Sequence, residues 1–154
     1  MKARRRSREL VKVTFVLDPL ECHLSGTERV WAESFGLDRY RIKNTPFHVF
    51  GVSAEDIVIA REQEGRLVYV SVLLRGGHST FRVVISEGMD RYFETHWRDL
   101  KRIGCSYEGG YSGGMYAIDV PPASDIYEVY GRLQLGAQAG VWTFEEGHCG
   151  HHPH

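Results

Sequence analysis

From residue 80 onward the sequence alternates between strand-like and helix-like patterns, and this order constrains the fold more than any other feature. Residues 81–85 (FRVVI) predict a strand. Apolar residues then recur at intervals of four, three and three, at Phe93, Trp97, Leu100 and Ile103. This spacing predicts a helix with one apolar face, which Gly104 can end in a left-handed conformation.

The same region continues with two strands, a second helix and a last strand. Residues 104–107 and 115–120 predict a strand pair with a glycine-rich tip. Asp125 followed by Glu128 resembles a capping box at the start of a helix. Residues 141–145 (VWTFE) predict the closing strand. The order β-α-β-β-α-β is that of a ferredoxin-like half, in which both helices cover one face of a four-stranded sheet.

The first part of the chain has no helical period and contains five strand-like segments, at residues 11–17, 28–35, 39–45, 57–61 and 67–74. They predict a small antiparallel β-sheet or a partly open barrel. The fold class is therefore α+β, with this sheet packed on the ferredoxin-like half because the turn between them is too short for a flexible tether. The predicted units are a basic flexible arm (1–10), an all-β subdomain (11–77), a ferredoxin-like subdomain (78–147) and a His-rich tail (148–154).

Composition excludes several classes of protein. The chain has 154 residues, 42% hydrophobic and 25% charged, which is typical of a globular domain. No apolar run approaches the roughly 20 residues of a membrane-spanning helix, and no signal-peptide core follows the start. Three cysteines without framework spacing favour a reducing compartment. We therefore expect a cytoplasmic protein that does not enter a membrane.

The start of the chain is basic, although the net charge of −1 gives no overall attraction for nucleic acid. Its cations are Lys2, Arg4, Arg5, Arg6, Arg8 and Lys12. A solvated arm is the favoured interpretation, because no aromatic residues are interleaved with these charges. Nucleic-acid binding is expected, if at all, only through this arm.

The turn RGGHSTFR, residues 75–82, is the most unusual polar cluster of the sequence. Its glycines let backbone N–H groups approach an anion, and its possible donors are Arg75, His78, Ser79 and Arg82. Glu108 is a candidate for the mouth of such a ligand site. His78-x-Thr80 also resembles half of the H-x-[ST] signature of two-histidine phosphoesterases, whose second half is missing. The favoured interpretation is structural, with His78 and Ser79 fixing the turn, ahead of ligand binding and catalysis.

The last residues gather side chains that suit Zn or Ni, with His148, Cys149 and His151 as the candidate metal ligands. Ligands this close together cannot easily surround one tetrahedral ion. A disordered tail with incidental metal affinity is therefore the favoured interpretation, and we expect no cofactor.

Several short motifs in order resemble a known family. They are RVWAESFGLDRYRIKNTPFHVFGVSAEDIV, GHSTFRVV, IGCSYEGG, IDVPP and VWTFEEG, and they lie between Val11 and Glu146. Together they resemble a bacterial family known only as a domain of unknown function. The resemblance implies an intracellular bacterial protein without an established activity, so it assigns no catalytic residue.

The sequence lacks the signatures of nucleotide-binding loops, zinc proteases and common serine hydrolases. We therefore expect a small binding or regulatory protein, immunity-like or modulator-like, with a protein partner or as a homodimer. The alternative is a small-ligand sensor or phosphoesterase-like hydrolase with its anion site at the His78 turn.

Overall fold

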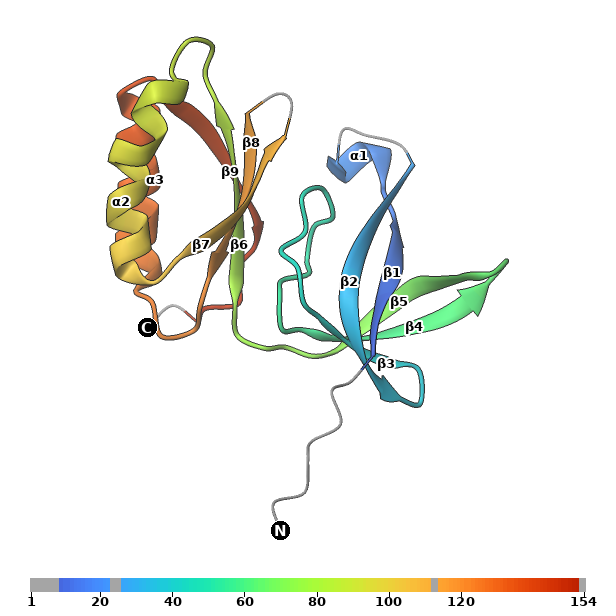
Figure 1. The fold of residues 1–154 in the computed structure, drawn as a ribbon. Helices are drawn as coiled ribbons and strands as arrows, with labels where there is room; N and C mark the ends of the chain where they lie inside the picture. The colour runs from blue at the N-terminus through green and yellow to red at the C-terminus, as the bar shows by residue number, and fades with distance from the viewer. Residues whose placement is uncertain (1–8, 23–25, 112–113, 153–154) are drawn as a thin grey trace.

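The computed structural model describes residues 9–22, 26–111 and 114–152, which form two β-rich halves joined near residue 76 (Figure 1). The predicted arm lies almost entirely outside the described residues. The first half contains β1 (Leu10–Val16), a short helix α1 (Pro19–Cys22), β2 (Thr27–Gly36), β3 (Arg39–Ile42), β4 (Ile57–Gln63) and β5 (Arg66–Leu74). All five predicted strands are present.

The five strands form a closed barrel in the order β1-β2-β3-β4-β5. Successive strands pair antiparallel, and β1 then pairs parallel with β5 at Val13↔Leu67 and Thr14↔Val68. This last pairing closes a barrel that the sequence predicted as an open sheet or a partly open barrel. Alternate residues such as Val13 and Phe15 point inward and are fully buried in the barrel core.

The second half contains β6 (Ser79–Ile85), the 3₁₀ turn η1 (Asp90–Tyr92), α2 (Phe93–Ile103), β7 (Ser106–Tyr111), β8 (Met115–Val120), α3 (Ile126–Gln138) and β9 (Trp142–His148). Its strands form an antiparallel sheet in the order β7-β8-β6-β9. Helices α2 and α3 lie side by side on one face of this sheet (Figure 1). The order of strands and helices is the one predicted from residue 80 onward.

The ends of both helices follow the predicted local signals. Gly104 caps α2 with a φ of 116°, a left-handed conformation that favours glycine. Asp125 caps α3, because its side chain accepts hydrogen bonds from the backbone N–H groups of Tyr127 and Glu128. The apolar faces of both helices then pack on Phe81, Val83 and other sheet residues.

The opposite face of the second sheet turns toward the barrel. Phe81 and Val83 of β6 belong to the helix-side core, so the alternation of the strand directs Thr80 and Arg82 the other way. Both side chains are nonetheless buried, at 0% and 1% exposure. Buried polar groups require partners, and here the barrel half supplies them. Among the described residues, no helix has the length and apolar character to cross a membrane.

Candidate functional site: the polar seam between the two halves

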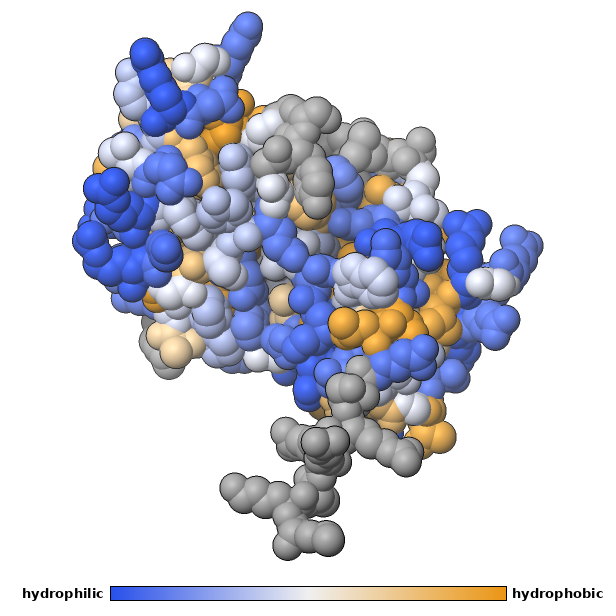
Figure 2. Space-filling view, in the orientation of Figure 1, coloured by the Kyte–Doolittle hydropathy of each residue, from blue (hydrophilic) through white to orange (hydrophobic). Residues whose placement is uncertain are grey.

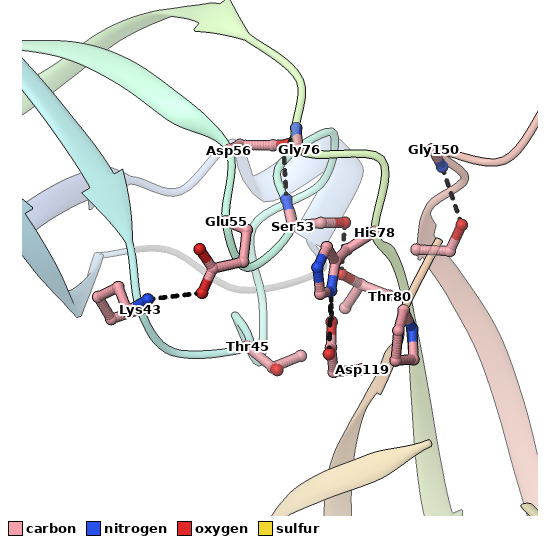
Figure 3. A network of polar contacts seen from close by, with 12 residues as sticks. Lys43, Thr45, Ser53, Glu55, Asp56, Gly76, His78, Thr80, Asp119 and Gly150 are labelled. Atoms are coloured by element: carbon pink, nitrogen blue, oxygen red, sulfur yellow. Dashed lines mark hydrogen bonds and ion pairs between the residues drawn. The ribbon is translucent and has the colours of Figure 1, made fainter. Parts of the chain in front are cut away.

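Asp56 is the centre of a polar seam, by which we mean the polar contacts that residues 43–56 and 75–82 make with one another, with the second sheet and with the C-terminal tail (Figure 3). Its buried carboxylate accepts hydrogen bonds from the backbone N–H of Ser53 (2.9 Å) and of Gly76 (2.9 Å). It also pairs with Arg75, whose Nη1 lies 3.1 Å from Oδ2. A side chain at Gly76 would overlap the backbone of Glu55. This glycine therefore permits close packing within the chain.

Arg75, the first predicted ligand residue, is held in place by several groups. Its Nη1 also donates to the carbonyl of Gly51 (2.6 Å) and lies 3.3 Å from Nε2 of His148. Burial and the neighbouring Arg75 cation lower the pKa of His148. The Arg75 guanidinium thus links the segment that connects the two halves with the end of β9.

His78 forms a pair with Asp119 of β8. Its Nδ1 lies 2.9 Å from Oδ1 and 3.0 Å from Oδ2, and the two side chains are only 17% and 13% exposed. Burial raises the pKa of Asp119, and the hydrogen bond from His78 acts against this rise. A carboxylate in this position fixes the orientation and tautomer of the imidazole.

Ser79 contacts a different histidine, in the C-terminal tail. Its Oγ lies 2.6 Å from Nδ1 of His151 and accepts a hydrogen bond from the backbone N–H of Gly150 (2.9 Å). Nε2 of His151 lies 2.9 Å from the carbonyl oxygen of Pro121. The expectation of a disordered tail is thus wrong for residues 148–152, because these bonds fold them against β6. Residues 153–154 lie outside the described residues.

Arg82 and Glu108 attach barrel segments to the second sheet. Arg82 donates from Nη2 to the carbonyl of Val49, and its Nη1 lies 3.5 Å from Glu145. The carboxylate of Glu108 accepts hydrogen bonds from Asn44 Nδ2 (2.8 Å) and from the backbone N–H of Thr45 (2.6 Å). Both side chains therefore connect segments that are far apart in the sequence.

The five predicted ligand residues therefore lie in one seam, and each contacts another part of the same chain. The sequence did not single out their partners Asp56 and Asp119. Each partner carried a weak signal: Asp56 follows a turn segment and directly precedes the IVIAR strand, and Asp119 interrupts the apolar strand MYAIDV. A carboxylate at such positions is buried only if it is paired.

The candidate metal ligands point to separate partners. His148 lies against Arg75, the Cys149 thiol lies 3.4 Å from the carbonyl of His151, and the His151 ring contacts Ser79. Within residues 9–22, 26–111 and 114–152, no group of three or more His, Cys, Asp or Glu side chains is arranged to hold a metal ion.

A pocket of about 630 Å³ lies beside this end of the seam. It is lined by Arg75, Gly77, residues 122–127 and residues 150–152. Of the five predicted ligand residues, Arg75 lines it, whereas His78, Ser79, Arg82 and Glu108 do not. The side chains of the His78 turn thus do not converge on this hollow.

Comparison with known protein families identifies the family of this chain. The model of a family described as domain of unknown function (DUF4265) matches residues 28–144. The chain belongs to this family. The resemblance seen in the short motifs is therefore confirmed, and the DUF4265 description assigns no activity. No curated protein matches the chain.

One solved structure is similar over nearly the whole length of this DUF4265 chain. It is described as a hypothetical protein from Neisseria gonorrhoeae, with a TM-score of 0.77 and 13% sequence identity. The similarity covers 97% of this chain and 100% of that one. At this level of identity the likeness shows a common fold and nothing about function.

Proposed function

We propose that this DUF4265 protein is a small binding protein that holds a protein partner on the outer face of β4 and β5. One observation carries the proposal. Aliphatic side chains gather on the outside of a barrel whose interior is already filled, and they are Ile57, Ile59, Val70, Leu73 and Leu74. We call this set the β4–β5 face. Figure 2 shows hydrophobic surface of this kind, interrupted by hydrophilic side chains, over the barrel half.

Two register shifts between β4 and β5 produce this face. Ala60 pairs with Tyr69 and Ile59 with Ser71, so Val70 is an extra residue on β5. The next shift leaves Leu73 as a second extra residue. Bulges of this kind redirect side chains. Both residues consequently point outward, at 47% and 48% exposure, while Tyr69 and Val72 still pack on the core.

The surroundings of the β4–β5 face suit a protein partner. Arg39 and Arg41 of β3 pair in register with Ile59 and Ile57 and border the face on one side, where Arg41 also forms ion pairs with Glu33 and Glu55. An apolar centre with an arginine-containing rim is typical of protein interfaces. Isolated exposed aliphatic residues need no explanation, but a contiguous group on one sheet face marks an interaction site.

The second half fits a ferredoxin-like unit, in its strand order and in its two helices on one face, but this fold hosts many functions. A partner could also bind the sheet face that carries no helices. Barrel residues cover part of that face at Thr80 and Arg82. The free surface of the barrel is therefore the better candidate.

The alternative of a sensor or phosphoesterase-like hydrolase at the His78 turn has less support. His78 is paired with Asp119, and Ser79 with His151 and Gly150. A ligand there would have to replace contacts that fix the turn and the tail on the second sheet. We therefore treat the turn as structural and the outer barrel surface as functional.

A photo-crosslinking amino acid at position 70 tests the proposal. In cells, we expect it to give a discrete crosslinked product that the variant Leu73→Glu abolishes. The matched control places the crosslinker at Leu135 of α3, which is 50% exposed. We expect no such product there, and Leu135→Glu should leave the position-70 product unchanged. Equal products from both positions, or none from position 70 together with a monomeric mass by light scattering, would contradict the proposal.

A further inference from the structure

We propose that a second surface of the barrel, the basic groove, binds single-stranded nucleic acid. The basic groove is a hollow of about 550 Å³ lined by Val11, Lys12, Thr14, Arg29, Trp31, Gly65, Arg66 and Leu67. It lies on β1, β2 and the start of β5. The inference is independent of the proposed protein partner, because it uses other residues and another ligand.

The charges of the basic groove oppose the net charge of the chain. Lys12, Arg29 and Arg66 are exposed cations, and the lining contains no acidic residue. The chain as a whole carries a formal charge of −1. A local cluster of cations in a hollow attracts phosphates, even when the whole protein does not.

Strand pairing brings an aromatic ring into the same hollow. Lys12 of β1 lies opposite Trp31 of β2, and Arg29 lies two residues along β2 on the same face. The parallel pair Thr14↔Val68 then places the start of β5, with Arg66, beside β1. Trp31 is 44% exposed, so one indole and three cations are open to a ligand. Proteins bind single strands with this combination, in which bases stack on aromatic rings and cations follow the backbone.

The Trp31 ring already attracts a cation. The Lys12 ammonium lies 4.8 Å from the ring centre. A cation–π contact at an exposed site is weaker than the stacking of a base on an aromatic ring. An incoming base can therefore displace Lys12, whose ammonium becomes available for the adjoining phosphate. A duplex presents no free base faces, which favours a single strand as the ligand.

The sequence before β1 adds further positive charge. Strand β1 begins at Leu10 and carries Lys12 into the groove, and the preceding residues include five cations, Lys2, Arg4, Arg5, Arg6 and Arg8. These charges lack interleaved aromatic residues in the sequence. The fold supplies the missing aromatic group, because it places Trp31 beside the strand that follows them.

Fluorescence anisotropy with labelled single-stranded DNA and RNA of about 12 nucleotides tests the inference. We expect binding to both, and Trp31→Ala should weaken it roughly tenfold. Arg29→Gln and Arg66→Gln should each weaken binding and reduce the slope of log K against log salt by about 0.7. The matched controls Tyr127→Ala and Arg98→Gln, on exposed residues of α3 and α2, should leave binding unchanged. Melting curves of all variants establish that they are folded.

Intrinsic fluorescence gives a second measurement. Trp97 and Trp142 are buried, so quenching by a bound single strand reports on Trp31. Unchanged affinity in Trp31→Ala would overturn the inference. The inference would also be overturned if binding were lost when Arg4, Arg5 and Arg6 are replaced by Gln but stayed unchanged in Trp31→Ala. Binding to phosphatidylserine vesicles without binding to oligonucleotides would overturn it in favour of a membrane surface.

Discussion

Replacement of Asp56 by Asn tests whether the polar seam is structural. The carboxylate is buried and accepts three hydrogen bonds, two at Oδ2 from Ser53 N–H and Arg75 and one at Oδ1 from Gly76 N–H. An amide of the same shape has one oxygen, which can take either carboxylate position. At the Oδ2 position it keeps the bonds from Ser53 and Arg75, and the NH₂ group is then directed at the backbone N–H of Gly76, a donor that it cannot accept.

The expected cost follows from the lost bond to Gly76 and from the weaker bonds that a neutral oxygen accepts from Ser53 and Arg75. A hydrogen bond to a charged group contributes about 1.5–3 kcal/mol to stability. The Arg75 side chain is 47% exposed, so water can replace part of its contact and its share is discounted. We therefore expect the free energy of unfolding to fall by about 2–4 kcal/mol. With a urea m-value of about 2 kcal/mol/M, the midpoint moves down by about 1–2 M.

Urea unfolding followed by circular dichroism measures this shift. Glu62→Gln, which removes a charge from an exposed residue of β4, is the matched control and should change stability by no more than about 0.5 kcal/mol. If Asp56→Asn unfolds at the same urea concentration as the control, the seam does not hold the chain together. The residues of the His78 turn would then again be candidates for ligand binding.

Two further predictions concern α3 and the end of β9. Gly131→Ala should raise the free energy of unfolding by about 0.5–1 kcal/mol, because the space around a Cβ there is open and alanine favours a helix. Gly136→Ala, five residues along the same helix, should lower it by about 1–3 kcal/mol, because its Cβ would overlap the Trp142 indole; equal effects of the two variants in thermal unfolding would refute this packing. Burial and Arg75 lower the folded-state pKa of His148 below its ordinary value of 6.5. As the pH falls through 6.5, the unfolded state therefore binds more protons than the folded state does. Wild-type stability should therefore decrease as the pH falls below about 6.5, and His148→Gln should show a smaller decrease; identical pH profiles of the melting temperature would contradict the assignment.

The sequence predicted the secondary structure well because its signals are local. The apolar face of residues 93–103 and the Asp125 cap specify their helices without help from the rest of the chain. Residues 11–15 (VKVTF) alternate between apolar and polar side chains, and glycines mark the turns. The short helix α1 was not predicted, because four residues cannot show a helical period.

Side-chain partners could not be predicted, because they lie far apart in the sequence. Nothing in the turn RGGHSTFR shows that His78 pairs with Asp119 or that Ser79 contacts His151. The same polar residues in isolation suit an anion site. Their hydrogen-bond partners come within reach only when the second sheet and the C-terminal tail fold against the turn.

The sequence by itself determined most of the segments that become strands and helices, the caps of α2 and α3, and the family to which the chain belongs, because periodicity, caps and short motifs are properties of neighbouring residues. Only the tertiary structure decided how those segments are used. The pairing of β1 with β5 closes the barrel and brings Arg66 beside Lys12 and Trp31. The bulges of β5 turn Val70 and Leu73 outward. Each outcome depends on contacts between strands, and the strength of such contacts is set by burial and register that no single segment contains.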